Sequence, residues 1–372
     1  NSQMKKTLIA MAAVAVAGTA LAQVTISGRA DVGNTNVKTT VTNAGNRLIT
    51  TANEAVGDDN LSTSFLKFTA SEDLGGGMSA AFVHDIDIAT DNGSTVVASG
   101  RDNTIGLTTG VGTIRLGRSY TPLFSVIGAS DVFGTTGAGT VNVFGGSNNA
   151  VRASNAVFLT SPSFGGLVVS AMMQKNESTS VANGVVADTS TSGKSYSLVY
   201  SAGAFNVAYG YGKELGAGVT NSFNAAFGGT AAVQTAGLVA VADVDAYAKT
   251  SAISGSYDLG SAKVFVGRTT NTLSANGEDV GSTKITETNF GVSVPMGAVT
   301  LMAGAGKNNW TANGSTGSLT GTDTVVGATY SLSKRTTAYI KTGTYNSYSG
   351  TLAAVAASSK TARTNVGLRH TF

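Results

Sequence analysis

Short stretches in which apolar and polar residues alternate recur along most of the chain. In the last stretch, 364–372, one parity carries Val366, Leu368, His370 and Phe372, and the other carries Asn365, Gly367, Arg369 and Thr371. A period of two residues is typical of a β-strand with one apolar face and one polar face. The stretch 23–33 alternates in the same way, so the pattern predicts strands near both ends of the sequence.

Between these two stretches, seven pairs of alternating segments are joined by tight turns. The turns fall at 72–77, 110–112, 162–166, 202–204, 258–260, 295–297 and 333–335. Longer segments rich in Thr, Ser, Asn and Gly separate the pairs, at 34–59, 88–100, 120–150, 176–193, 212–246, 270–287, 307–323 and 344–361. Together with the terminal strands, the pattern predicts about sixteen antiparallel strands, an even number, as bacterial barrels have.

The regular alternation of short turns with long segments favours a membrane barrel over a soluble β-sandwich. Outer-membrane barrels have short periplasmic turns and longer external loops, whereas a sandwich has no reason to segregate the two lengths. Composition agrees, because Gly is abundant, with 48 residues, and only 12% of residues are charged, about half the usual share of a soluble protein. The predicted fold is all-β: a transmembrane antiparallel β-barrel forming a single domain over 23–372.

The first 22 residues predict a leader and a cleavable signal peptide. Lys5 and Lys6 form a charged start, 8–18 is apolar, and Ala20-Leu21-Ala22 is an A-x-A cleavage site. We predict cleavage between Ala22 and Gln23, which directs the chain to an envelope compartment or out of the cell.

Few residues are suited to catalysis or metal binding. The chain has no Cys, a net charge of only +3 and no basic stripe, so disulfides, thiolate metal sites and nucleic-acid binding have no support. A hydrolytic site needs a His paired with a Ser or an acid, and His84 beside Asp85 and Asp87 is the one candidate. Alternation places His84 on the apolar parity, away from both acids. We therefore expect no enzyme, no metal and no cofactor.

The polar parity of the strands carries the candidate pore residues. A charge facing lipid is costly, so these residues should face the lumen, where charge at a constriction sets ion selectivity. The basic candidates are Arg29, Lys67, Arg115, Arg152 if its strand is unbroken, and Arg118 at the root of the 120–150 segment; Asp31 and Asp131 oppose them. The alternative is that they are paired wall residues with little influence on permeation.

Several motifs resemble the general diffusion porins of beta-proteobacteria, the neisserial and Burkholderia type of the Gram-negative porin family. They are LGRSYTP at 116–122, NAVFLTSPSFGG at 155–166, GVSVPMGAV at 291–299, GATYSLSKRT at 327–336 and the terminal GLRHTF. The resemblance implies a sixteen-stranded homotrimer whose third external loop, here 120–150, folds inward to constrict the pore. It also implies an assembly signal at Phe372, Leu368 and Val366 that the barrel-assembly machinery reads, and contact with outer-membrane lipid and lipopolysaccharide.

We therefore predict a porin of the Gram-negative outer membrane, a water-filled channel for passive diffusion of small hydrophilic solutes and ions. Without Lys5 and Lys6 the 24 basic residues become 22 against 21 acids, so location must decide selectivity. External charges beyond the Debye length of about 8–10 Å are screened, so the lumenal cluster predicts a weak anion preference. The alternatives are a substrate-preferring outer-membrane channel and a surface adhesin or structural β-barrel.

Overall fold

The computed structural model describes residues 23–42, 48–58, 60–93, 101–135, 151–176, 179–182, 185–188, 191–215, 247–274, 282–313, 316–352 and 355–372. The predicted signal peptide, 1–22, lies outside these residues. The first strands are β1 (Gln23–Thr42), β2 (Leu48–Asp58), β3 (Phe65–Gly75), β4 (Met78–Asp87), β5 (Asn103–Thr109), β6 (Gly112–Tyr120), β7 (Arg152–Thr160) and β8 (Leu167–Asn176).

The remaining strands complete the wall, apart from one small external hairpin. They are β9 (Thr179–Ala182), β10 (Val185–Asp188), β11 (Thr191–Ala202), β12 (Phe205–Leu215), β13 (Tyr247–Asp258), β14 (Lys263–Ser274), β15 (Thr283–Met296), β16 (Val299–Ala312), β17 (Gly317–Ser331), β18 (Thr336–Leu352) and β19 (Val355–Thr371). β9 and β10 pair only with each other. No helix in the described part of the chain is long and apolar enough to cross a bilayer.

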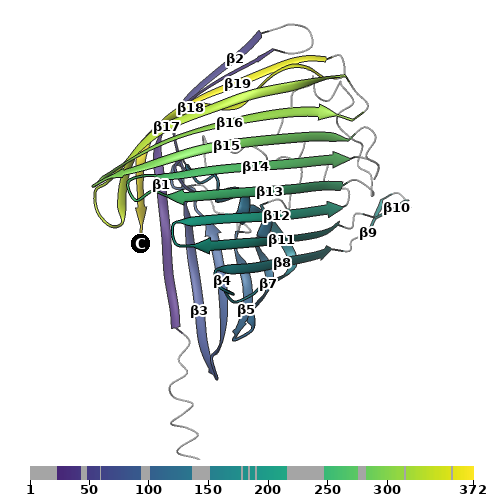
Figure 1. Cartoon of the computed structure of the whole chain (residues 1–372), viewed down its shortest axis with the longest axis vertical. Coiled ribbons are helices and arrows are strands. Elements are labelled where there is room, and N and C mark those ends of the chain that lie inside the picture. The colour runs from purple at the N-terminus through teal and green to yellow at the C-terminus, as the bar shows by residue number, and fades with distance from the viewer. Residues whose placement is uncertain are drawn as a thin grey trace, which may run out of the picture.

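One antiparallel sheet closes on itself (Figure 1). It holds seventeen strands, and β2 pairs only with the outer part of β1, which leaves sixteen strands around the circumference among the described residues. The first and last strands close the ring, since β1 pairs with β19 over a register that runs from Arg29 opposite Thr371 to Thr42 opposite Ser358. The lower part of β1 pairs with β3. The predicted sixteen-stranded antiparallel barrel is confirmed.

All seven predicted tight turns join the strands they were expected to join. Figure 1 shows the turns between β11 and β18 together at one end of the barrel. The predicted loop boundaries were less accurate, because β1 continues to Thr42 and β2 occupies 48–58, both within the segment read as the loop 34–59. Thr and Val have high β-propensity, so this segment forms strands although it has no continuous apolar face.

The two parities of each strand face different environments. Val266 on β14 and its register partner Phe290 on β15 are 44% and 58% exposed, whereas the next residues, Gly267 and Asn289, are buried. Exposed large apolar residues fill the first parity on many strands, which is the inverse of a soluble protein and typical of a lipid-facing wall. The other parity therefore lines the lumen.

The segment after β6 packs against lumen-facing residues. Thr121 caps helix α2 (Pro122–Gly128) by accepting a hydrogen bond from the Phe124 N–H. The helix contacts β11, β12 and β13, and the Leu123 N–H donates to Ser195 Oγ at 3.0 Å. A Cβ on Gly210 would lie 3.0 Å from Val126 Cγ2, so glycine allows the helix to approach the wall. The chain then crosses further strands, where Asn289 Nδ2 donates to the Ser130 carbonyl at 2.7 Å.

Candidate functional site: an arginine-lined cavity

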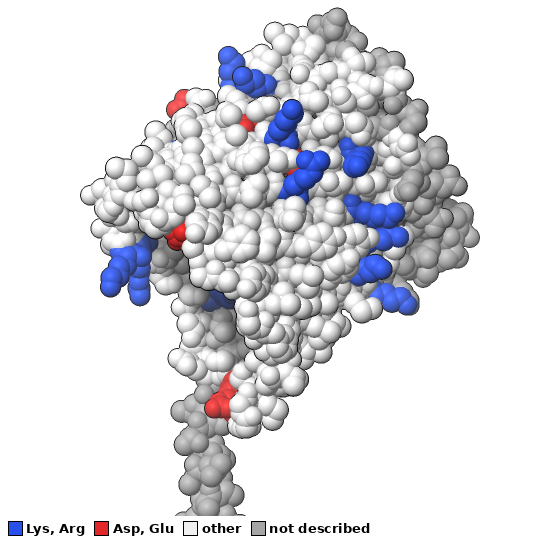
Figure 2. Space-filling model, in the orientation of Figure 1, with Lys and Arg blue, Asp and Glu red and all other residues white. Residues whose placement is uncertain are grey.

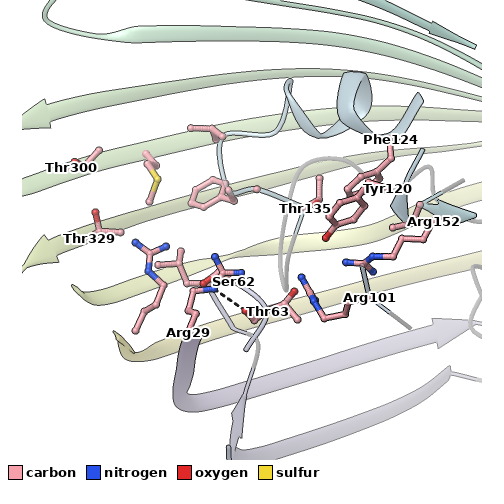
Figure 3. A pocket seen from close by; sticks show the side chains of 17 residues that line it. Arg29, Ser62, Thr63, Arg101, Tyr120, Phe124, Thr135, Arg152, Thr300 and Thr329 are labelled. Atoms are coloured by element: carbon pink, nitrogen blue, oxygen red, sulfur yellow. Dashed lines mark hydrogen bonds between the residues drawn. The ribbon is translucent and has the colours of Figure 1, made fainter. Parts of the chain in front are cut away.

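A cavity of about 590 Å³ lies within the barrel, between the start of β1 and the segment after β6 (Figure 3). Four of its lining residues are arginines: Arg29, Arg101, Arg152 and Arg369. Hydroxyl groups accompany them, from Ser62, Thr63, Tyr120, Thr135, Thr300 and Thr329. None of the described residues that line the cavity is an aspartate or a glutamate. We refer to this space as the arginine cavity.

Arg29 and Arg101 both contact the ring of Phe65. Their guanidinium carbons lie 4.9 and 5.3 Å from the ring centroid of Phe65, within the range of a cation–π contact. Arg29 Nε also donates to the Thr63 carbonyl at 2.8 Å, the bond drawn in Figure 3. Because the two arginines share one support, their charges are fixed close together rather than free to move apart.

Arg101 is the arginine with acidic partners. Its Nε lies 3.2 Å from Asp85 Oδ1 and its Nη1 lies 2.9 Å from Asp87 Oδ1, both on β4. Burial alone lowers the pKa of Arg101, but Tyr120, Asp85 and Asp87 together raise it, so the guanidinium stays charged. Asp85 and Asp87 are therefore both paired with Arg101 and are not among the residues that line the cavity.

Arg152 is positioned by an aromatic stack at the base of the helix. Its guanidinium carbon lies 4.0 Å from the ring centroid of Tyr120, and Tyr120 stacks on Phe124 of α2 with centroids 4.6 Å apart. Figure 3 shows Arg152 beside Arg101 below this stack. Nε of Arg152 is buried and has no hydrogen-bond partner among the described residues. The aromatic stack therefore fixes the position of this guanidinium at the cavity wall.

Arg369 enters the cavity from the last strand. It lies opposite Asp31 in the register of β1 and β19, two positions from the pair formed by Arg29 and Thr371. Closure of the barrel is thus what brings the arginine of the terminal strand beside that of the first strand. The terminal polar parity already contained this residue, but sequence reasoning did not select it.

Asp31 is fully buried and serves as an anchor for the chain. Its Oδ2 accepts hydrogen bonds from the N–H groups of Leu61 and Ser62 at 3.0 and 2.7 Å and from Ser62 Oγ at 3.2 Å. Its Oδ1 accepts a hydrogen bond from Tyr339 Oη at 2.5 Å. Asp31 thereby holds the 61–64 segment, which supplies the carbonyl for Arg29, and it is not among the residues that line the cavity.

The other predicted pore residues lie outside the cavity lining. Lys67 faces the lumen opposite Asp85 in the register, and Arg115 lies 5.4 Å from the ring centroid of Phe158 and donates to Ser119 Oγ at 3.1 Å. Asp131 accepts hydrogen bonds from the N–H groups of Phe133 and Thr135, which stabilises its own turn. Of the seven predicted residues, the structure thus brings Arg29 and Arg152 together in the arginine cavity.

Arg118 lies on the outward parity of β6, with exposed Leu116, rather than on the lumenal parity of Arg115. It lies opposite Asn103 in the register and donates to Ser154 Oγ at 2.6 Å. Simple alternation from Leu116 also assigns Arg118 to this parity, and the irregularity between Gly117 and Ser119 only shifts its register relative to β7. Arg101 was missed because alternation extended back from Ile105 and Leu107 assigns it to the outward parity, whereas β5 begins only at Asn103.

The two halves of the only candidate hydrolytic pair face opposite sides of the wall. His84 lies beside Phe68 and Phe82, with ring centroids 6.5 and 6.4 Å away, and it contacts Asn103 on the outward parity. Asp85 and Asp87 point inward to Arg101. The structure therefore does not bring a His and an acid together at this position.

Comparison with known sequences identifies a protein family and a curated relative. A family profile described as Gram-negative porin matches residues 8–350. The outer membrane porin protein 32 of Delftia acidovorans is 36% identical over 176 residues, which are 44% of this chain and 47% of that protein. The alignment thus spans about half the length of this curated relative.

Solved structures share the fold over nearly the whole chain. The anion-selective porin from Comamonas acidovorans superposes with a TM-score of 0.70 at 21% identity, covering 95% of this chain and 100% of that one. The trimer form of OmpT, an outer-membrane protein of Vibrio cholerae, superposes with a TM-score of 0.65 at 14% identity, covering 94% and 99%. At these identities the likeness concerns the fold.

Proposed function

Because the chain belongs to the Gram-negative porin family, we propose that it forms a water-filled channel through which small hydrophilic solutes and ions diffuse passively across the outer membrane. A closed barrel satisfies every backbone polar group of the wall without water, which a spanning structure needs. Diffusion down a gradient requires no cofactor, energy source or catalytic residue. The separation of His84 from Asp85 supports a channel without enzymatic activity.

We propose that the channel weakly prefers anions, and the observation that carries this proposal is the arginine cavity. Four guanidinium groups face one space whose described lining holds no carboxylate. Asp31, Asp85, Asp87 and Asp131 are engaged with donors or with Arg101. A charge at a constriction acts on a passing ion that comes within a Debye length of it. The positive charge of the cavity lining therefore influences ion selectivity more than the nearly balanced net charge of the whole chain. The anion selectivity stated for the Comamonas porin is consistent with this preference.

Reversal potentials in planar bilayers test the preference directly. Under a KCl gradient the wild type should give a potential of the sign for anion preference, larger at low salt because screening is weaker. The double variant Arg29→Gln with Arg152→Gln should lose most of it. Arg268→Gln with Lys307→Gln, which removes two outward-facing charges, is the matched control and should leave it unchanged. Cation preference in the wild type, or equal shifts in both variants, would contradict the proposal.

A substrate-preferring channel on the same scaffold is the second candidate. The convergence of guanidinium and hydroxyl groups on one cavity favours it, since such groups recognise oxyanions with defined geometry. Inorganic phosphate should then block the chloride current saturably in the wild type but not in the Arg29→Gln, Arg152→Gln variant. A block that rises linearly with phosphate and without saturation would favour general diffusion.

We propose that the 120–150 segment forms the constriction. Support comes from its first half, in which α2 and the residues to Thr135 pack against lumen-facing positions such as Gly210 and Asn289. Residues 136–150 lie outside the described part of the chain. Three predicted pore residues do not line the arginine cavity: Lys67, Arg115 and Arg118. In this proposal they affect ion selectivity only through longer-range electrostatics.

We propose further that the mature protein starts at Gln23, after a signal peptide ending at Ala22, and assembles as a homotrimer. A trimer form is known for the OmpT relative, and the barrel closes on itself only when the end of the chain is in place. Val366, Leu368 and Phe372 share the outward parity of β19, where the barrel-assembly machinery can read them. If the protein were an adhesin or structural barrel instead, purified protein would conduct nothing in a bilayer.

A further inference from the structure

The arginine cavity brings cationic and apolar side chains into one space. On the outside of the barrel the two kinds of surface are kept apart, since Figure 2 shows broad stretches of the outer wall without a charged side chain. Inside, apolar residues line the cavity together with the four arginines: Leu61, Phe124, Val132, Phe133, Val151 and Met302. A compact inorganic anion can contact the arginines, but it has no apolar surface to set against these side chains.

Three of these apolar residues belong to one packed cluster. Phe133 is 3% exposed, and Val132 and Met302 pack against the cluster that it forms with Val325. Val132 and Phe133 lie in the segment after α2, whereas Met302 lies on β16. Because the cluster is anchored on a strand of the barrel, the surface that it offers to the cavity is fixed in place. We call Val132, Phe133 and Met302 the apolar side of the cavity.

Two glycines allow the apolar side to form against the barrel. Met302 lies opposite Gly327 in the register of β16 and β17. A Cβ on Gly327 would lie 3.1 Å from Phe133 Cε1, and a Cβ on Gly291 of β15 would lie 3.0 Å from Val132 Cβ. Glycine at these two positions therefore lets both side chains approach the strands closely. The apolar side is thus built on β15, β16 and β17.

The four arginines come from another arc of the barrel. They lie on β1, directly before β5, at the start of β7 and on β19. In the sheet, β18 lies between β17 and β19, and β19 pairs with β1. Figure 3 shows Thr300 and Thr329, from β16 and β17, at one end of the cavity and Arg101 and Arg152 at the other. A molecule that fills the cavity therefore meets apolar side chains and positive charge on different sides.

From these two sides we propose that the cavity selectively binds small aromatic carboxylates, with the carboxylate at the arginines and the ring against the apolar side. Guanidinium groups pair with carboxylates through two parallel hydrogen bonds. The sulfur of Met302 and the ring of Phe133 are both favourable neighbours of an aromatic ring. The volume of about 590 Å³ lies in the range of sites that take small organic molecules. The inference rests on the proposed function, because it names the substrate class of the substrate-preferring channel.

Equilibrium binding to purified protein in detergent micelles tests the proposal without a measurement of conductance. Isothermal titration calorimetry, corrected by titration into empty micelles, would compare benzoate with acetate, which lacks the ring, and with benzyl alcohol, which lacks the charge. The test variant is Met302→Thr, which removes the thioether from the apolar side. The matched control is Met173→Thr, since Met173 is 72% exposed on the outward face of β8.

We expect the wild type to bind benzoate at least about tenfold more tightly than acetate or benzyl alcohol. Met302→Thr should lower the ratio of benzoate affinity to acetate affinity about three- to tenfold, because apolar contact is lost, and Met173→Thr should leave the ratio unchanged. Equal wild-type affinities for benzoate and either comparison ligand, or equal ratios in the two variants, would overturn the proposal. If Met302→Thr fails to fold, the isosteric Val132→Thr takes its place. Failure of the proposed function is read separately, since it shows as purified protein that conducts nothing in a bilayer.

Discussion

Replacing Asp31 by alanine should destabilise the barrel more than replacing any single exposed acidic residue by alanine would. The substitution removes one acceptor group from four donors, those of Leu61, Ser62 twice, and Tyr339. A hydrogen bond to a charged group contributes about 1.5–3 kcal/mol, and an unsatisfied buried donor costs about 1–3 kcal/mol. Such terms do not add fully, because lumenal water can reach part of the site, so we expect a loss of about 3–5 kcal/mol.

A guanidinium titration of protein folded into lipid vesicles measures this loss. The chain has one tryptophan, Trp310 on β16, so its fluorescence reports unfolding of the wall. Asp258→Ala is the matched control, since the Asp258 carboxylate accepts one hydrogen bond, from the Gly260 N–H, in an exposed turn. That variant should lose about 1 kcal/mol or less.

Tyr339→Phe separates the parts of the Asp31 site. It removes one donor to the carboxylate and should cost about 1.5–3 kcal/mol, with a coupling to Asp31→Ala of similar size in a double-mutant cycle. Asp31→Ala should also increase current noise, because the anchored 61–64 segment carries the carbonyl that holds Arg29. If Asp31→Ala were no less stable than Asp258→Ala, the anchoring role would be wrong.

Three further predictions concern assembly and the constriction. Deleting Phe372 should sharply lower outer-membrane levels, because its backbone exchanges two hydrogen bonds with Gly28 and its ring packs there; a normal yield of heat-modifiable barrel on gels would contradict this. Removing 134–146 should raise single-channel conductance, and an unchanged conductance in a folded mutant would place the segment outside the pore. Gly267→Ala should displace the segment after α2, because the new Cβ would clash with Ser130 and Asn289. Protease cleavage within 121–135 should therefore be faster than in the control variant Gly255→Ala, whose Cβ would lie 3.6 Å from its nearest neighbour.

The barrel was predictable from sequence because its two environments impose a local pattern. Lipid outside and water inside force alternation along each strand, and most of the tight turns contain a glycine with positive φ, such as Gly203 or Gly297. Strand alternation and turn glycines are both local signals, since each depends on residues close together in the sequence. The family assignment from motifs such as LGRSYTP was likewise confirmed by the profile match.

The site was only partly predictable, because it depends on contacts between distant segments. Strand parity alone placed Arg29 in the lumen. It did not indicate that the carboxylate of Asp31, on the same parity, accepts hydrogen bonds from the 61–64 segment and from Tyr339. Alternation extended back from Ile105 assigns Arg101 to the outward face, whereas β5 begins only at Asn103 and Arg101 lines the cavity. Arg118 follows the alternation of β5 but is displaced relative to β7 by the irregularity at Gly117. Bulges and ion pairs of this kind leave no period in the sequence.

The pairing of β1 with β19 constrains the order in which the protein can fold. Arg29 and Thr371 are register partners although nearly the whole described chain separates them, so the final seam joins the first and the last described strands. Loop-closure entropy opposes such contacts, and contact order this high slows folding. Until the last strand arrives, β1 presents an unpaired edge that can recruit other chains. The barrel can therefore close only after β19 has been synthesised, and the free edge of β1 needs protection for the whole interval.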